Sequence, residues 1–278
     1  AQLSGGKLGF LTSGANTVGG YLAGAVPGKG GKPAAAMLSQ ALKAYVVLHA
    51  EPLLDADNGA QAVTTLKAAE FVVALTPYAS SARDWANVML PIAPFTETSG
   101  TFVNAQGTAQ SFKGTVAPRG QSRPAWKVLR VLGNILHLAG FDDESSDTVR
   151  DAVMVDGLDA RLSNQIQAAP GVSGSVVQGL QRVTDVPIYR TDAIVRRAPA
   201  LQACAASKAP AARMHEQTLA ELGLSNGASI RVKSQTGQAS LVAEMDNTLP
   251  AGAVRISAAF EQTADLGSAF GQLQVERA

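Results

Sequence analysis

The sequence has one cysteine, Cys204, and three histidines, His49, His137 and His215, among 278 residues. A single thiol cannot form an intrachain disulfide, which favours a reducing compartment. It also cannot supply the roughly four cysteine-type ligands that an iron–sulfur cluster needs. None of the histidines stands at metal-ligand spacing from another histidine, cysteine or carboxylate. The sequence therefore predicts no metal site, and we expect Cys204 to be inert or exposed at the surface.

Charged residues and long apolar runs are also scarce. Charged residues make up 16% of the chain and the net charge is +1, which argues against nucleic acid as a main partner. No apolar run approaches the roughly 20 residues of a membrane span, so we expect no direct membrane insertion. With 46% hydrophobic residues, the chain is too apolar for disorder, and its length suits one large domain or two ordinary ones.

Catalytic and nucleotide-binding signatures are missing as well. Gly28-Lys29 lacks the following Ser or Thr of a P-loop, and no dinucleotide fingerprint is present. Ser122 and Ser173 each follow a glycine by two residues but lack the second glycine of a nucleophile elbow. We therefore predict no catalytic residue in this chain.

The first half of the chain alternates apolar strands with helices. Near-continuous apolar strands separated by helices predict a parallel sheet covered on both faces, which defines an α/β fold. Proline suits the first turn of a helix, which supports a helix beginning at Pro33. The expected strands are residues 8–12, 45–49, 71–75 and 88–90, with helices at 33–43 and 60–69.

The second half divides into helices and then short strands. An apolar stripe predicts a helix over 124–139 that is capped by Gly140, and a second helix follows over 147–168. Alternating patterns predict strands at 228–234, 239–244 and 253–257. We therefore expect an α/β body over residues 1–204, including the helical pair 124–168, and a small β-rich domain over 205–278.

A binding crevice is expected where the carboxyl ends of parallel strands converge. Polar turns follow three of the expected strands there, and the glycine and asparagine of the last turn can take left-handed backbone positions. An ordinary exposed loop with a hairpin return is the alternative for that last turn. The candidate binding residues are Ser13, Asn16, Glu51, Gly100, Asn104 and Gly107.

The order of residues around that loop resembles a signature of the molybdopterin oxidoreductase family. The resemblance rests on Val88-Met-Leu-Pro91, on Thr96-Glu97, and on Gly100-Thr-Phe-Val-Asn104 followed by Gly107 and Gln110. More narrowly, residues 94–104 and 188–202 resemble the large iron–sulfur subunits of bacterial NADH:quinone oxidoreductase, respiratory complex I. The short strands after residue 214 resemble the small β-barrel that closes molybdopterin oxidoreductases, although this stretch is shorter than usual for that barrel.

The resemblance implies a molybdopterin-oxidoreductase-like body that supports a cluster-bearing region upstream. It implies other subunits of the complex I peripheral arm as partners, and a cytoplasmic position, peripheral on the inner face of the bacterial plasma membrane. We expect a carboxy-terminal fragment that has no cofactor of its own and no NADH dehydrogenase activity when isolated, with the iron–sulfur clusters upstream.

The crevice is expected to be vestigial, with the fold retained and the cofactor lost. A doubly phosphorylated cofactor wants cationic groups, yet Thr108 stands where the wider family usually has arginine. The loops offer carboxylates instead, at Glu51, Asp55, Asp57 and Glu97, and carboxylates repel phosphates.

Two other functions remain open from the sequence. One is the body of an active molybdopterin-dependent enzyme, such as a formate dehydrogenase or nitrate reductase. The other is an unrelated nucleotide-binding α/β module. The basic residues Arg190, Arg196 and Arg197 are either contacts for a partner subunit or a solvated connector.

Overall fold

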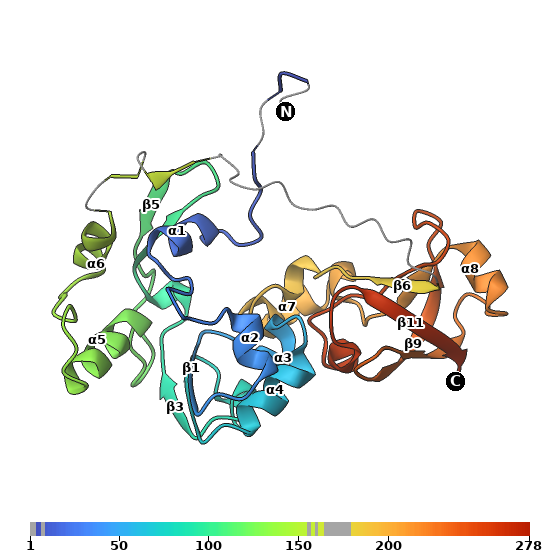
Figure 1. Cartoon of the computed structure of the whole chain (residues 1–278), viewed down its shortest axis with the longest axis horizontal. Helices are drawn as coiled ribbons and strands as arrows, with labels where there is room; N and C mark the ends of the chain where they lie inside the picture. Colours follow the sequence, from blue (N-terminus) through green and yellow to red (C-terminus); the bar gives the residue numbers. More distant parts are fainter. Residues whose placement is uncertain (1–3, 7–8, 155–156, 159–160, 164–178) are drawn as a thin grey trace. The chain divides into compact units, whose positions relative to one another are not determined.

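A computed structural model describes the chain except for residues 1–3, 7–8, 155–156, 159–160 and 164–178 (Figure 1). The chain divides into two compact units. Unit 1 comprises Ala1–Pro33 and Leu90–Ser173, and unit 2 comprises Ala34–Met89 and Gly174–Ala278. Each unit is therefore built from two separate stretches of sequence.

Unit 1 contains a hairpin and short helices. The strands β4 (Gly100–Val103) and β5 (Ala109–Phe112) pair antiparallel, with Gly100 opposite Phe112 and Val103 opposite Ala109. The alternative of a hairpin return at this loop is therefore confirmed. The helices are α1 (Thr17–Leu22), α5 (Ala125–Ile135) and α6 (Ser146–Val153), and the 3-10 turn η2 (Phe95–Glu97) precedes β4.

Three expectations for unit 1 are wrong. Residues 9–12 of the expected first strand form no strand, and Phe10 and Leu11 are 53% and 98% exposed. The helix expected over 124–139 ends at Ile135, because the amide of Leu138 donates back to the carbonyl of Gly133 at 2.9 Å. His137, with φ of 55°, takes a left-handed position just after the helix, so Gly140, with φ of 85°, follows the helix end rather than capping it.

The second helix of the expected pair is also shorter than predicted. It ends at Val153 rather than at residue 168, and part of the expected remainder lies outside the described residues. Its start is well specified by a capping box, in which the Ser145 hydroxyl accepts from the amide of Thr148 at 3.1 Å.

The parallel sheet has the order β1-β2-β3, with β1 at Ala44–Leu48, β2 at Phe71–Thr76 and β3 at Val88–Pro91. β1 and β2 run parallel, with Ala44 opposite Phe71. Helix α2 (Ala34–Ser39) precedes β1 in the sequence. Helices α3 (Pro52–Asp55) and α4 (Gly59–Lys67) lie between β1 and β2. The expected parallel arrangement is confirmed for β1 and β2.

One face of this sheet packs against helices and carries the core of this part of unit 2. The buried residues of that core are Tyr45, Leu66, Val72, Ala74, Ala82 and Trp85. Side chains alternate between the two faces of a strand, so Val46 and Leu48 of β1 point away from that core. They are 57% and 42% exposed, so the expectation that both faces are covered is wrong for β1.

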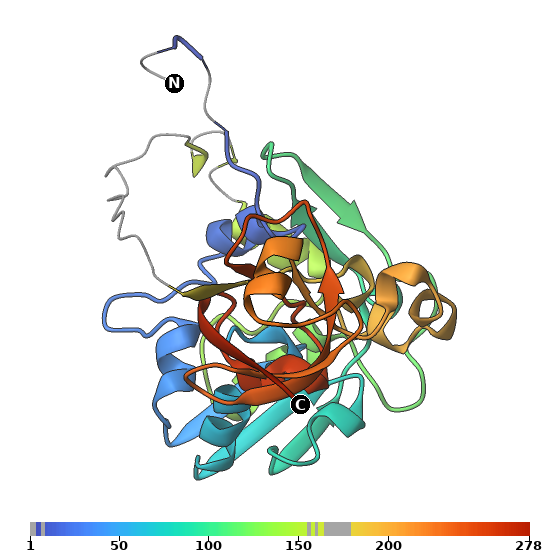
Figure 2. The same cartoon turned by 90° about the vertical axis from the view of Figure 1, so that its right-hand side faces the viewer.

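The last part of unit 2 is a closed six-stranded barrel in the order β10-β6-β11-β8-β9-β7, which Figure 2 turns toward the viewer. Its interior is lined by apolar residues that alternate with outward polar ones, as along β9, where Ala239, Leu241 and Ala243 point inward. Helix α8 (Glu216–Glu221) places Leu219 in the same core. The strands are β6 (Leu180–Val183), β7 (Ala212–Met214), β8 (Ser229–Lys233), β9 (Gln238–Met245), β10 (Ala253–Arg255) and β11 (Gly271–Arg277).

The barrel begins earlier than the boundary at residue 205 that we expected. β6 pairs with both β10 and β11, and this pairing closes the barrel. The six strands therefore form a complete barrel, although the stretch after residue 214 alone is too short for one. Between β6 and β7 the chain folds into short turns rather than an extended connector. These are η4 (Ile188–Arg190), η5 (Val195–Arg197), α7 (Pro199–Gln202) and η6 (Ala205–Ser207).

We predict that Gly59→Ala destabilises unit 2. A Cβ at Gly59 would lie 1.9 Å from the carbonyl oxygen of Leu53, and backbone cannot move aside cheaply. The expected loss is about 1–3 kcal/mol of unfolding free energy, measured by urea denaturation. Gly20→Ala is the control, because a Cβ there has no neighbour within 4 Å in helix α1. Equal stability of the two variants would contradict the prediction.

Candidate functional site

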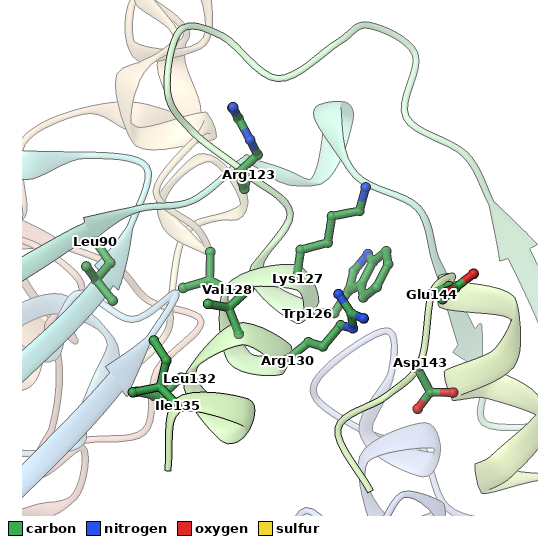
Figure 3. A pocket seen from close by; sticks show the side chains of 11 residues that line it. Leu90, Arg123, Trp126, Lys127, Val128, Arg130, Leu132, Ile135, Asp143 and Glu144 are labelled. Atoms are coloured by element: carbon green, nitrogen blue, oxygen red, sulfur yellow. The ribbon is translucent and has the colours of Figure 1, made fainter. Parts of the chain in front are cut away.

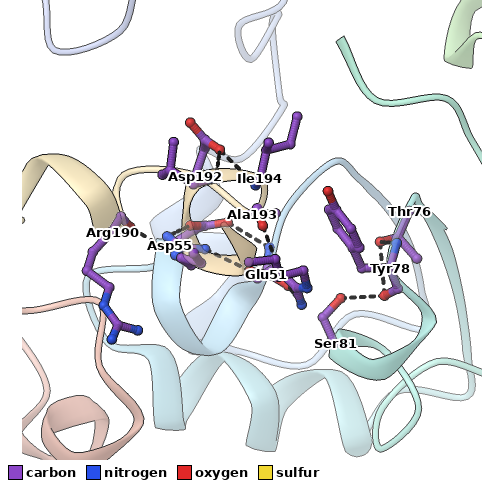
Figure 4. Close-up of polar contacts among 12 residues, drawn as sticks. Glu51, Asp55, Thr76, Tyr78, Ser81, Arg190, Asp192, Ala193 and Ile194 are labelled. Atoms are coloured by element: carbon purple, nitrogen blue, oxygen red, sulfur yellow. Dashed lines mark hydrogen bonds and ion pairs between the residues drawn. The ribbon is translucent and has the colours of Figure 1, made fainter. Parts of the chain in front are cut away.

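The carboxyl end of β1 carries a cluster of ion pairs (Figure 4). Glu51 follows β1 as the residue before helix α3, and Asp55 ends that helix. Arg196 Nη1 lies 2.9 Å from Glu51 Oε2, and its Nη2 lies 2.5 Å from Asp55 Oδ1. Arg197 Nη2 lies 2.5 Å from Glu51 Oε1. We call Glu51, Asp55, Tyr78, Arg196 and Arg197 the strand-end cluster.

Both arginines of the strand-end cluster are held by their own segment. Arg196 Nε donates to the carbonyl oxygen of Arg190 at 2.9 Å, and Arg197 Nη1 donates to that of Ala193 at 3.0 Å. The guanidinium carbon of Arg197 lies 4.2 Å from the centroid of the Tyr78 ring. Tyr78 follows β2 in the sequence. Residues from the ends of two neighbouring strands thus meet the same short turn.

The cluster is neutral as a whole and mostly buried. The side chains of Arg196 and Glu51 are 5% and 6% exposed. Burial alone would raise the pKa of the Glu51 carboxyl, but the hydrogen bonds and positive charges of Arg197 and Arg196 outweigh it and hold that pKa below its ordinary value. Glu51 therefore stays ionised.

Asp57 links the loop after α3 to the barrel. Its two carboxylate oxygens accept from the hydroxyl of Ser268 at 2.7 Å and from the amide of Ala269 at 3.0 Å. The neighbouring carbonyl oxygens of Gly267 and Ser268 accept from Nη1 of the buried Arg182 at 2.7 and 2.8 Å. The side chain of Asp57 therefore joins the loop after α3 to the barrel within unit 2.

Five of the six candidate binding residues lie in unit 1, around the β4–β5 hairpin. Asn16 Oδ1 accepts from the amide of Val103 at 2.8 Å and ties helix α1 to β4. Asn104 Oδ1 accepts from the amides of Gln106 and Thr108 at 3.0 and 2.9 Å and closes the turn. The sixth candidate, Glu51, lies in unit 2.

The two candidate glycines are needed for the shape of the hairpin. Gly107 has φ of 88°, and a Cβ there would lie 2.3 Å from Leu162 Cδ1. A Cβ on Gly100 would lie 2.8 Å from the ring of Phe112 on the paired strand. Ser13, by contrast, is exposed and makes no hydrogen bond with the described part of the chain.

A hollow of about 640 Å³ lies beside the hairpin turn within unit 1. Gly107 and Gln106 line it, whereas Asn16 and Gly100 line a smaller hollow of about 220 Å³. Arg161 is the charged residue that lines the larger hollow. Its guanidinium is already engaged, because it donates to the carbonyl oxygens of Val153, at 2.6 Å, and of Leu22.

Another hollow of unit 1, of about 660 Å³, runs along helix α5 (Figure 3). Its lining combines an apolar floor with charged groups, and it contains no cysteine, histidine or serine. Its residues are Leu90, Arg123, Trp126, Lys127, Val128, Arg130, Val131, Leu132, Ile135, Asp143 and Glu144.

The arginines at the end of β1 and beside the hairpin turn are poorly placed to hold a doubly phosphorylated cofactor. Phosphates are held by cationic side chains whose donors are free to reach them. The arginines at the end of β1 instead bind Glu51 and Asp55, and Arg161 binds backbone carbonyls. In the described part of the chain, no group of three histidine, cysteine, aspartate or glutamate side chains is arranged to hold a metal ion.

Comparison with protein families identifies the fold and the class of protein. Residues 2–135 match the molybdopterin oxidoreductase model, and residues 180–274 match the molybdopterin dinucleotide binding domain. The chain therefore contains a domain of the molybdopterin oxidoreductase family, followed by a molybdopterin dinucleotide binding domain. The structure of acetylene hydratase from Pelobacter acetylenicus superposes with a TM-score of 0.58 over 87% of this chain and 46% of that one. At 14% identity this likeness concerns the fold alone.

The chain is similar in sequence to subunits of respiratory NADH dehydrogenases. The mitochondrial NADH-ubiquinone oxidoreductase 78 kDa subunit of Neurospora crassa is 32% identical over 137 residues, which are 44% of this chain and 18% of the relative. Mitochondrial NADH dehydrogenase [ubiquinone] iron-sulfur protein 1 of Solanum tuberosum is 28% identical over 128 residues, 44% and 17% of the two chains. The match spans less than a fifth of these relatives.

A relative with a different name matches a shorter stretch. A putative formate dehydrogenase of Staphylococcus aureus is 33% identical over 73 residues, which are 26% of this chain and 7% of the relative.

Among the described residues, no helix has both the length and the apolar character to cross a membrane.

Sequence reasoning missed the pairing of Arg196 and Arg197 with Glu51. We had considered these arginines as partner contacts or as a solvated connector, but they form internal ion pairs. The repulsion of phosphate that we expect from Glu51 and Asp55 is reduced, because Arg196 and Arg197 neutralise these carboxylates. No signal in the sequence identified this pairing, because the connector holds three arginines and three acids follow β1.

We predict that Arg196→Met destabilises the protein more than Arg197→Met does. Removing Arg196 leaves Glu51 and Asp55 without their buried partner, at an expected cost of about 3 kcal/mol or more. Arg197 is 32% exposed, so solvent screens its charge and we expect a cost of about 1 kcal/mol. Urea denaturation of both variants at pH 7 measures the difference, and a larger loss for Arg197→Met would refute it.

We predict that acid weakens the strand-end cluster. The pKa of Glu51 is lower in the folded protein than in the unfolded chain, where it is about 4.3. Its contribution to stability is therefore complete above that value and is lost as the pH falls through the folded-state pKa. The difference in unfolding free energy between the wild type and Glu51→Gln should shrink between pH 6 and pH 3. A constant difference over this range would count against the assignment.

Proposed function

We propose that the chain is the carboxy-terminal structural and assembly region of the large iron–sulfur subunit of an NADH:quinone oxidoreductase. It supports electron transfer from NADH to quinone without holding a cofactor itself. Its partners are the other subunits of the peripheral arm, and it lies on the cytoplasmic side, peripheral to the inner face of the bacterial plasma membrane. The iron–sulfur clusters of that subunit lie upstream of the residues described here.

The likeness to the 78 kDa subunit carries this proposal. Two relatives named as NADH dehydrogenase subunits each align over 44% of this chain. The name of the Solanum tuberosum relative describes that whole subunit as an iron-sulfur protein. This chain has a single cysteine, which is too few for a cluster. A supporting role is the one that fits such a chain.

The strand-end cluster supports the loss of the pterin cofactor. Its two arginines and two carboxylates neutralise one another, so a phosphate at the end of β1 would have to break these pairs. Breaking a buried ion pair costs about 3–5 kcal/mol. The crevice residues Asn16, Asn104 and Gly107 shape a hairpin rather than offering charge.

An active molybdopterin enzyme is the second candidate, and the putative formate dehydrogenase relative favours it. In that case the strand ends would have to accept a doubly phosphorylated, anionic cofactor. The alignment is short, and the groups at the ends of the strands are already engaged. This candidate is nevertheless testable in the same preparation.

The test is a native purification of the full-length protein with its partners. We expect it to co-migrate with NADH:quinone reductase activity and to contain molybdenum and tungsten at far less than one atom per chain, measured by elemental mass spectrometry. Stoichiometric metal, together with a pterin dinucleotide released on denaturation, would overturn the proposal and favour the enzyme. Formate oxidation by the same sample would identify the formate dehydrogenase type.

A further inference from the structure

A polar cavity of about 250 Å³ opens in the outer wall of the barrel, within unit 2. The segment that leads from β6 to β7 forms one side of it, and strands β7 and β10 form the other. Three cationic side chains, Lys208, Arg213 and Arg255, line the cavity together with one carboxylate, Asp185, and the hydroxyl of Ser257. The lining therefore carries three positive charges and one negative charge.

The two arginines are register partners on neighbouring strands. Arg255 of β10 lies directly opposite Arg213 of β7 in the antiparallel ladder. Their neighbours Val254 and Met214 are fully buried in the barrel, so the arginines face outward. Like charges directly opposite one another destabilise a sheet. An anion bound between the two guanidinium groups would be attracted to both and would screen their mutual repulsion.

Each arginine is anchored on one side and leaves donors free on the other. Arg213 Nε binds Glu244 Oε2 at 3.0 Å, and Arg255 Nη2 binds Asp246 Oδ2 at 2.6 Å. Within the described chain, the remaining guanidinium nitrogens of both arginines donate no hydrogen bond. Lys208 is exposed and forms no ion pair with a described residue. These acids reduce the net charge nearby, but they also orient the arginines.

Asp185 is a carboxylate placed in a basic cavity without an ion pair to a described residue. Its Oδ1 accepts from the hydroxyl of Ser257 at 2.9 Å, and its backbone carbonyl accepts from the amide of Ala258 at 2.9 Å. Its Oδ2 has no donor in the described chain. A ligand that suits both the cations and this oxygen must be an anion that carries a hydrogen-bond donor.

We propose that this cavity binds a phosphate group. Lys208, Arg213 and Arg255 take its negative charge, and Asp185 accepts the hydrogen of a protonated phosphate oxygen. Phosphate still carries acidic hydrogen near neutral pH, whereas sulfate carries none. Sulfate would bring an oxygen lone pair against the Asp185 carboxylate, so the cavity should select phosphate over sulfate. This site is independent of the proposed role in NADH:quinone oxidoreductase.

The test is isothermal titration of the full chain at pH 7 and low ionic strength with inorganic phosphate and with sulfate. We expect phosphate to bind at least tenfold more tightly than sulfate. Lys208→Met should weaken phosphate binding at least fivefold, while Lys67→Met, which removes an exposed lysine of α4 outside the cavity, should leave it unchanged. Lys208 is exposed, so its variant keeps the barrel intact, which a thermal unfolding scan verifies.

Asp185→Asn supplies the decisive comparison. The asparagine amide no longer repels sulfate, so the affinity for phosphate should exceed that for sulfate by no more than about twofold. A variant that only weakened the binding of all anions would keep the preference for phosphate. Adenosine monophosphate, titrated at about pH 6 so that much of the monoester keeps its second proton, distinguishes the sources of the group. Binding of inorganic phosphate alone supports a free ion, and binding of the monoester supports an esterified ligand. Failure of both to bind, or equal binding of phosphate and sulfate in the wild type, overturns the proposal.

Discussion

The buried ion pair between Arg196 and Glu51 is the interaction on which the order of unit 2 depends. It joins two residues 145 positions apart and brings the turns after β6 onto the end of β1. Taking two charges out of water costs several kcal/mol for each ion, so such a pair persists only when every donor and acceptor is engaged. Here Asp55, Arg197 and the carbonyl oxygen of Arg190 supply those partners.

This arrangement connects the family fold to the proposed loss of its chemistry. In open α/β sheets a ligand commonly binds where the carboxyl ends of parallel strands meet. In this chain the same place is occupied by side chains that satisfy one another, with Tyr78 stacked on Arg197. The fold can persist without a ligand there, because the charges that a ligand would have neutralised already have internal partners.

How far the sequence could predict this structure depended on how local each signal was. β1, β2 and β3 were recognised because each is a compact apolar run. Residues 8–12 gave the same signal, yet Phe10 and Leu11 are exposed, because an apolar run does not by itself provide a neighbouring strand. β6 and β7 have four and three residues, too few for alternation to be distinguished from chance.

The candidate site was predictable only where its bonds are local. Asn104 and Gly107 were identified as turn residues from their types, and the structure gives them turn hydrogen bonds and a positive φ. The ion pairs of Glu51 could not be inferred, because sequence pattern carries no information on which of several arginines returns to a given strand end. The same holds for Arg213 and Arg255, which became neighbours only through the register of β7 and β10.

The two charged regions of unit 2 differ in one respect that decides where an anion would go. The strand-end cluster has two cations and two anions in mutual contact, so its field outside the contact is small. In the barrel cavity each arginine forms an ion pair with one acid through a single nitrogen. Lys208 forms no ion pair with a described residue, so donors of all three cations remain available. A free anion gains little at a neutral, closed cluster and more at donors that are oriented but unfilled. The end of β1 is thus electrostatically closed, whereas the outer wall of the barrel is open.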